Sequence, residues 1–123
     1  MKNKQLNIAT VQFAVSESLR KNAGQIRRYM KKAAKSGAQI VHFPECALSG
    51  YVGTDFPNFE GYDWQLLKEE TETVMSLAKE LGIWVVLGST HRLTEPNKPH
   101  NSLYLVDPKG KVVDRYDKRF CTP

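Results

Sequence analysis

The chain of 123 residues has the length of one domain, and its 41% hydrophobic and 25% charged residues are typical of a folded globular protein rather than a disordered one. No apolar stretch approaches the roughly 20 residues that a membrane-spanning helix needs, and no signal-peptide pattern follows Met1. We therefore expect a soluble, cytoplasmic protein with no membrane partner.

The formal net charge of +5 raises the question of nucleic-acid binding. Many of the basic residues fall on the polar side of one helical pattern, which is the common arrangement of a solvated helix face. No nucleic-acid-binding motif accompanies them, so we expect no nucleic-acid partner. The two cysteines, Cys46 and Cys121, are far fewer than a disulfide-stapled domain contains, and we expect both thiols to be reduced.

The first elements in chain order are a strand pattern and a helix pattern. Residues 6–13 form a β-like run that no proline or glycine interrupts. From Leu19 onward the apolar positions step by three and four residues. Ser16 or Ser18 is placed to cap the start of this helix, and Gly37 is placed to end its last turn.

A second strand and a second helix follow. Residues 38–43 have the pattern of a buried strand, which Pro44 stops because proline lacks a backbone N–H. Residues 49–61, rich in glycine and aromatic residues, suit an ordered surface loop. Apolar positions from Trp64 to Leu81 then share one face of a helix. Strand, helix and strand in this order predict a parallel strand pair.

The last third of the chain consists of strand patterns. Residues 83–88 form a continuous apolar run, which is typical of a strand covered on both faces. Residues 102–106 and 111–116, joined by the turn Asp-Pro-Lys-Gly at 107–110, predict an antiparallel hairpin. Parallel pairs followed by a hairpin predict an α/β fold with a mixed sheet and two helices on one face.

Glu45 is the first candidate for chemistry. It lies just past the C-terminal end of the second predicted strand, where open α/β sheets place their ligand crevices. Phe43 and Pro44 precede it, so we expect partial desolvation, which favours a role in proton transfer. A glutamate that caps a turn or pairs with a lysine has the same local pattern, so its position alone leaves both interpretations open.

Lys118 is the second candidate. It lies in the charged run at residues 114–120, where a fixed ammonium beside a carboxylate can stabilise charge developing on a substrate oxygen. Its neighbours Arg115 and Asp117 equally suit ordinary surface pairing, which is the usual role of lysines in such runs. The spacing leaves both roles open.

Two sequence blocks resemble the nitrilase superfamily of carbon–nitrogen hydrolases. Residues 40–51, Ile-Val-His-Phe-Pro-Glu-Cys-Ala-Leu-Ser-Gly-Tyr, are similar to the family's strand, Pro-Glu, short spacer and Gly-Tyr. Residues 101–112, which begin Asn-Ser, and the following Tyr116-Asp117-Lys118 are similar to its Asn-Ser, hydrophobic strand, turn and lysine block. Both blocks occur in family order, so the resemblance spans essentially the whole chain.

The resemblance implies the N-terminal half of an α-β-β-α sandwich and a Glu–Lys–Cys triad. Such a triad hydrolyses the amide or nitrile of a small molecule through a thioester acyl-enzyme, without a cofactor. Glu45 matches the general base, and Lys118 matches the cation that stabilises the tetrahedral intermediate. Tyr51 is a candidate substrate-binding residue and equally a candidate for packing its loop. The resemblance also implies a homo-oligomer when the protein is intact.

The family's nucleophilic cysteine lies on a later strand, so residues 1–123 are expected to be a partial hydrolase domain, truncated before the nucleophile and inactive alone. We expect Cys46 to be a buried structural thiol and Cys121 to have an incidental role. His91 and His100, nine positions apart beside a predicted loop, lack the cysteines or carboxylates of a zinc site. We therefore expect no metal.

Two alternative functions stay open at this stage. The first alternative is the glutaminase domain of an NAD synthetase, which shares the Gly50-Tyr51 block. A long C-terminal ATP-binding domain would distinguish such a synthetase from an amidase. The other alternative is a catalytically inactive short homologue that acts as a binding or assembly module. Half a sandwich exposes strand edges and an apolar face, so such a module would need a partner to cover them.

Overall fold

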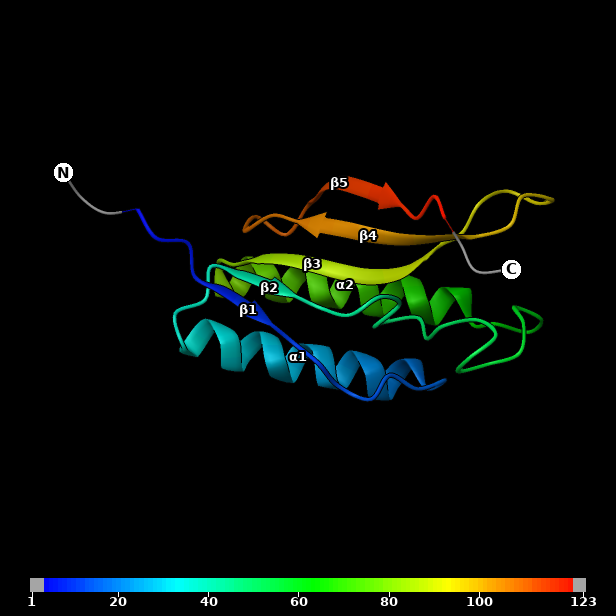
Figure 1. The fold of residues 1–123 in the computed structure, drawn as a ribbon, viewed down its shortest axis with the longest axis horizontal. Coiled ribbons are helices and arrows are strands. Elements are labelled where there is room, and N and C mark those ends of the chain that lie inside the picture. Colours follow the sequence, from blue (N-terminus) through cyan, green and yellow to red (C-terminus); the bar gives the residue numbers. More distant parts are fainter. Residues whose placement is uncertain (1–3, 121–123) are drawn as a thin grey trace.

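Within residues 4–120, which the computed structural model describes, five strands form one mixed sheet and two helices cover one of its faces (Figure 1). The strands lie side by side in chain order. The elements are β1 (Ile8–Thr10), α1 (Leu19–Lys35), β2 (Ile40–His42), α2 (Trp64–Leu81), β3 (Trp84–His91), β4 (His100–Val106) and β5 (Val112–Asp117).

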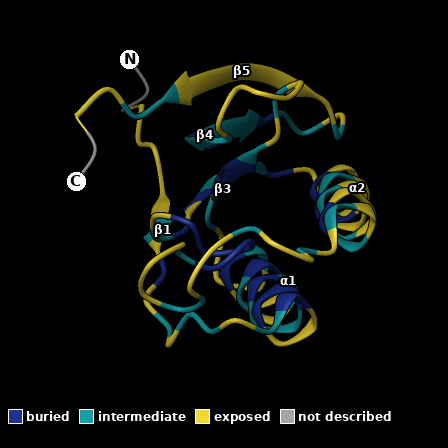
Figure 2. Ribbon diagram, turned by 90° about the vertical axis from the view of Figure 1, so that its right-hand side faces the viewer, coloured by how far each residue is buried: buried dark blue, intermediate teal, exposed yellow. Residues whose placement is uncertain are grey.

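The first half of the sheet is parallel, as predicted. Strand β2 lies between β1 and β3 and pairs in parallel with both. Each connection runs through a helix, and both connections advance in the same direction across the sheet. Because such crossovers are right-handed, both helices lie on the same face, where α1 and α2 contact each other (Figure 2).

Local hydrogen bonds mark the helix ends. The Ser18 hydroxyl, one of the two predicted caps, accepts from the backbone N–H of Lys21 at 3.2 Å at the start of α1. Asp63 caps α2 by accepting from the N–H of Leu66 at 2.9 Å. The helix ends at Gly82, whose φ of 65° is a left-handed conformation that glycine adopts without a steric penalty.

The hydrophobic core lies between the helices and the sheet. Fully burying a large aliphatic or aromatic side chain stabilises a fold by about 1.5–3 kcal/mol, so these residues dominate the folding energy. The largest apolar side chains with under 2% exposure come from both helices, three strands and the chain after β2: Ile26, Met30, Phe43, Leu48, Leu87, Val41, Val74, Val85 and Val106.

The basic residues of α1 lie on its solvent side, as predicted. Most of them are exposed, namely Arg20, Lys21, Arg28, Lys31, Lys32 and Lys35. Arg27 is partly buried, and its guanidinium pairs with Glu70 of α2 at 2.6 Å. This ion pair links the two helices.

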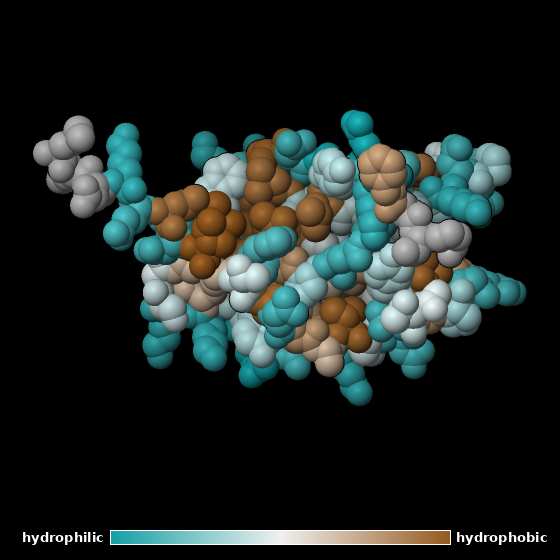
Figure 3. Space-filling model, viewed as in Figure 1, coloured by the Kyte–Doolittle hydropathy of each residue, from teal (hydrophilic) through white to brown (hydrophobic). Residues whose placement is uncertain are grey.

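None of the helices within residues 4–120 covers the opposite face of the sheet, where apolar side chains gather over the strands in Figure 3. Ile8 is 56% exposed and Tyr116 57% exposed. The apolar run at residues 83–88 predicted a strand covered on both faces, with Trp84 packed in the core, but Trp84 alternates with the fully buried Val85 and is in register with Ile40. Strand alternation therefore turns Trp84 toward the uncovered face, which corrects the prediction.

Strand lengths differ from the predictions for a physical reason. The first two strands are three residues long rather than eight and six. Pro44 ends β2, and β1 pairs only with β2, so neither ladder extends further. In contrast, β3 continues to His91 because β4 pairs with it along seven positions, the last of which joins His91 to His100. Both strands therefore extend up to the histidines that flank the predicted loop.

Candidate active site

The carboxylate of Glu45 and the ammonium of Lys118 form an ion pair across 73 positions of sequence. Glu45 Oε1 lies 2.6 Å from Lys118 Nζ. Glu45 is on the turn that follows β2, and Lys118 directly follows β5. Their side chains are 44% and 31% exposed, so Glu45 is less desolvated than its sequence neighbours suggested and both groups can be reached from solvent.

Asn101 contacts both members of the ion pair. Its side-chain Nδ2 donates to Glu45 Oε1 at 3.0 Å, and its backbone carbonyl accepts from the N–H of Lys118 at 2.8 Å. The sequence reasoning assigned Asn101 no role beyond its place in a family block. The available signal was its place at the start of the Asn-Ser block, directly before the predicted strand at residues 102–106.

Tyr51 lies beside Lys118, with its ring centroid 5.7 Å from Lys118 Nζ. The hydrogen bond to Glu45, followed by contributions from Tyr51, raises the pKa of Lys118 above that of an ordinary lysine. Lys118 therefore stays protonated throughout the neutral range. The backbone N–H of Tyr51 donates to Asp55 at 2.7 Å, which holds the loop in place. Whether Tyr51 contacts a substrate stays a prediction.

A tight turn presents Glu45. The N–H of Ala47 donates to the carbonyl of Pro44 at 3.1 Å, which closes the turn. Cys46 has a φ of 54°, the left-handed region that non-glycine residues rarely occupy. Such a conformation costs on the order of 1–3 kcal/mol and persists only where the surroundings impose it.

Cys46 is a buried thiol, as predicted, with 3% of its surface exposed. Burial, and then the charge of Glu45, raise its pKa to about 12. A thiol with this pKa is almost entirely protonated at neutral pH, and the thiolate is the reactive form. Cys46 is therefore unsuited to act as the nucleophile. Cys121 lies outside the described residues.

The helix-facing side of the hairpin carries a separate set of polar contacts. The Ser102 hydroxyl donates to Asp117 Oδ1 at 2.6 Å, and this bond, followed by the contacts of Arg115, lowers the pKa of Asp117. His91 Nδ1 lies 2.6 Å from the Tyr104 hydroxyl, and burial, followed by the charge of Arg115, lowers the pKa of His91. None of these bonds involves Glu45 or Lys118.

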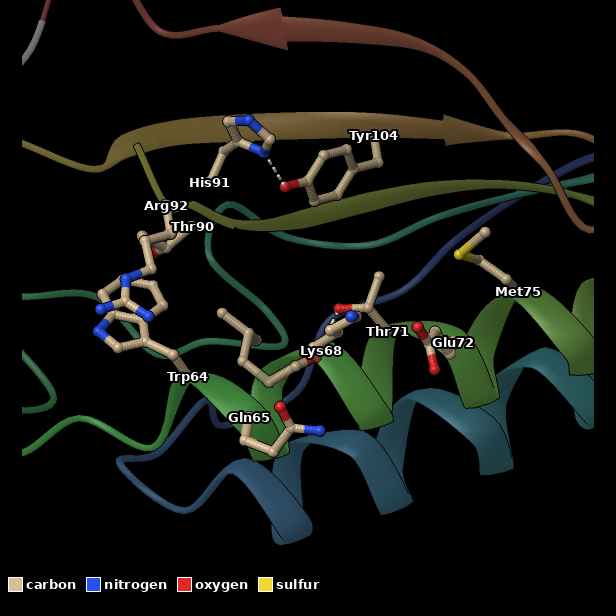
Figure 4. Close-up of a pocket in the computed structure, with 11 residues that line it drawn as sticks. Trp64, Gln65, Lys68, Thr71, Glu72, Met75, Thr90, His91, Arg92 and Tyr104 are labelled. Atoms are coloured by element: carbon tan, nitrogen blue, oxygen red, sulfur yellow. Dashed lines mark hydrogen bonds between the residues drawn. The ribbon is translucent and has the colours of Figure 1, made fainter. Parts of the chain in front are cut away.

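A pocket of about 290 Å³ opens beside the ion pair and is lined by His42, Glu45, Asn101, Ser102, Leu103, Tyr116 and Lys118. A larger pocket of about 440 Å³ lies between α2 and the strands β3 and β4 (Figure 4). Trp64 and Tyr104 help to line it, but neither Glu45 nor Lys118 does. Because acid–base chemistry requires the reacting groups within hydrogen-bond reach, the smaller pocket is the candidate active site.

Residues 4–120 contain no group of three or more histidine, cysteine, aspartate or glutamate side chains that could hold a metal ion. In the same part of the chain, neither helix combines the length and the apolar character needed to cross a membrane.

Sequence comparison identifies relatives over nearly the whole chain. The family model for carbon-nitrogen hydrolases matches residues 7–121. Omega-amidase NIT2-A of Xenopus laevis is 34% identical over 111 residues, which cover 90% of this chain and 39% of the relative. Omega-amidase NIT2 of Homo sapiens is 29% identical, with the same two coverages of 90% and 39%. The chain thus spans about two fifths of the length of these curated relatives.

Solved structures share the fold. An amidase from Nesterenkonia sp. superposes with a TM-score of 0.81 at 22% identity, over 100% of this chain and 46% of the amidase. A carbon-nitrogen hydrolase from Helicobacter pylori G27 superposes with a TM-score of 0.77 at 17% identity, over 94% and 40%. This likeness confirms the expected α/β architecture as part of a larger nitrilase fold. The family model matched at residues 7–121 shows that the chain belongs to the carbon-nitrogen hydrolase family, which confirms the resemblance to the nitrilase superfamily.

Proposed function

We propose that Glu45 and Lys118 are the general base and the charge-stabilising cation of a Glu–Lys–Cys triad that hydrolyses the amide or nitrile of a small molecule. The observation that carries this proposal is the 2.6 Å contact between the two side chains, which lie 73 positions apart in the sequence. A pocket of about 290 Å³ beside them leaves room for a small acyl group.

Each residue has a defined task in this mechanism. Glu45 takes the proton of a cysteine thiol, and the thiolate attacks the amide carbon. Lys118 stabilises the negative charge that develops on the substrate oxygen. As the tetrahedral intermediate collapses, the protonated Glu45 gives its proton to the leaving nitrogen, so the carbon–nitrogen bond breaks, ammonia leaves and a thioester remains. Glu45 then accepts a proton from water, which attacks the thioester and releases the acid and the thiol.

We infer that the nucleophilic cysteine comes from a part of the protein outside residues 1–123. The raised pKa of Cys46 supports this inference, since a buried, protonated thiol is a poor nucleophile. Cys46 is also adjacent to Glu45 in the turn and points into the core. The relatives named omega-amidases make small amides the first substrate class to test.

The test uses the intact protein expressed from its gene and a panel of small aliphatic amides, omega-amides and nitriles. Ammonia release is measured for each compound, and the acyl-enzyme is sought by mass spectrometry of rapidly quenched reactions. Turnover of a panel member, with an acyl group attached to a cysteine, supports the proposal. Absence of ammonia release from every compound, or turnover that survives complete thiol alkylation, contradicts it.

A further inference from the structure

Gly88, in the middle of β3, occupies a position where no side chain fits. A Cβ atom added there would overlap the carbonyl oxygen of Pro44 and would lie 2.8 Å from the backbone nitrogen of Cys46 and 3.1 Å from the carbonyl carbon of Glu45. Gly88 is not among the glycines with positive φ, so its backbone conformation is open to any residue. The requirement for glycine is therefore one of space.

Hydrogen bonds hold the Glu45 turn against this point of β3. Just before the turn, the N–H of Phe43 donates to the carbonyl of Val86 at 3.0 Å. Just after it, the N–H of Leu48 donates to the carbonyl of Gly88, also at 3.0 Å. These two bonds fix both ends of the turn against β3. The atoms of the turn lie directly over the Cα atom of Gly88.

Lys118, the other member of the ion pair, is also positioned by β3. In the ladder between β3 and β4, Gly88 is opposite Leu103, and Thr90 is opposite Asn101. Asn101 in turn holds the backbone N–H of Lys118 at 2.8 Å. Strand β3 therefore sets the position of Glu45 through the turn that lies on it, and the position of Lys118 through the hairpin paired with it.

We propose that Gly88 is a positioning residue for Glu45, because its missing side chain lets the Pro44–Cys46 backbone lie close enough to β3 for Glu45 to reach Lys118. A methyl group at this position pushes the turn away by on the order of 1 Å, a misplacement that costs an active site roughly 100-fold in rate. The expected effect of Gly88 on the catalytic rate rests on the proposed function. Its expected effect on the distance between Glu45 and Lys118 does not.

The test compares Gly88→Ala with Gly24→Ala in the intact protein. Gly24 is a matched control because it lies in α1 and nothing lies within 4 Å of the Cβ that the substitution adds. Thermal melts, crystal structures, and kcat and KM for a hydrolysed amide are measured for both variants and for the unaltered protein.

For Gly88→Ala we expect a cooperative melt and a Glu45 Oε1 to Lys118 Nζ distance beyond the roughly 3.2 Å limit of a good hydrogen bond. We also expect a fall in kcat of about 100-fold with little change in KM. Gly24→Ala retains the distance of 2.6 Å and the kcat of the unaltered protein. A residue that only stabilised the fold would lower the melting temperature without changing the distance or the kcat of the folded enzyme.

A Gly88→Ala structure that keeps the Glu45–Lys118 contact overturns the inference, and so does an unchanged kcat. If Gly88→Ala gives no cooperative melt, the variant is not folded, and a crystal structure of the unaltered protein then tests the inference. A Pro44 oxygen within 3.0 Å of the ideal Cβ position at Gly88, closer than real Cβ atoms come, upholds the inference, and a longer distance overturns it. If the unaltered protein hydrolyses nothing, the proposed function fails, and the crystallographic distances alone decide the role of Gly88.

Discussion

The backbone N–H of Lys118 donates to the carbonyl of Asn101 at 2.8 Å, which extends the pairing of β4 with β5 one residue past the end of β5. Facing residues of an antiparallel pair direct their side chains to the same side. The Asn101 amide and the Lys118 ammonium therefore both reach Glu45 Oε1. A lysine that belongs to a charged run in the sequence is thus held in place by the sheet.

Glu45→Gln and Lys118→Ala should each lower kcat of the intact protein by about 1,000-fold, because one removes the base and the other removes the cation. Both side chains are partly exposed, so the melting temperature should change little. The measurement is ammonia release under saturating substrate, with the exposed Lys109→Ala as control. Rates near normal in either active-site variant would rule out the assigned role.

Asn101→Ala should lower kcat by about 10-fold, because Glu45 loses a hydrogen bond that orients it. Asn101→Asp should have a larger effect, since it replaces a donor 3.0 Å from a carboxylate by a second carboxylate. Asn97→Ala is the matched control, because the Asn97 amide bonds only within its own exposed loop. An Asn101→Asp variant as active as Asn101→Ala would show that the charge at this position does not affect Glu45.

Ser102→Ala should raise the pKa of Asp117 toward the ordinary aspartate value of about 3.9, because the Ser102 hydroxyl bond is the main cause of its depression. A depressed carboxyl pKa stabilises the fold above the unfolded-state pKa, and this contribution disappears as pH falls through the folded-state pKa.

The stability difference between the unaltered protein and Ser102→Ala should therefore be largest above about pH 4 and should shrink in stronger acid. Urea unfolding from pH 2 to 7, combined with an NMR titration of the Asp117 carboxyl, checks both statements. A difference in stability that stays constant across this range would mean that the hydrogen bond has no preference for the ionised carboxylate.

Cys46 should resist alkylation in the folded protein at pH 7, because its thiol is buried and its pKa is raised to about 12. Incubation with iodoacetamide followed by peptide mass spectrometry measures the modified fraction at this position. The same reaction in urea should label Cys46 fully, which serves as the control. Rapid labelling of the native protein would instead indicate an accessible, activated thiol.

The elements of the fold were predictable because they depend on local chemistry. Apolar spacing of three and four residues defined both helices, and Pro44 and Gly37 marked where β2 and α1 end. Strand lengths were less accessible, since a ladder extends only as far as its partner does. Trp84 illustrates the limit. A continuous apolar run does not say which of its residues face the helices and which face the uncovered side of the sheet.

The sequence allowed us to predict which residues belong to the candidate site, but not how they are arranged in space. Glu45 and Lys118 were recognisable from family-like blocks, but their contact depends on the strand order and on the hairpin register. Asn101 acts through the same register, so its contact with Glu45 could not be predicted from the block in which it lies. Gly88 had a detectable signal, because an isolated glycine in an apolar strand often marks a close approach of another backbone. The sequence could not say which backbone approaches it.

The hydrogen bond between Ser102 and Asp117 has a consequence for how the hairpin assembles. Asn101 and Ser102 are adjacent on β4 and face opposite sides of the sheet, and Asp117 and Lys118 do the same across the ladder. A slip of one residue would present the Asp117 carboxylate to Glu45 in place of the ammonium, and would leave Ser102 without its partner. The hydrogen bond on the helix-facing side therefore stabilises the correct register of β4 and β5, and this register places Asn101 and Lys118 beside Glu45 on the opposite side of the sheet.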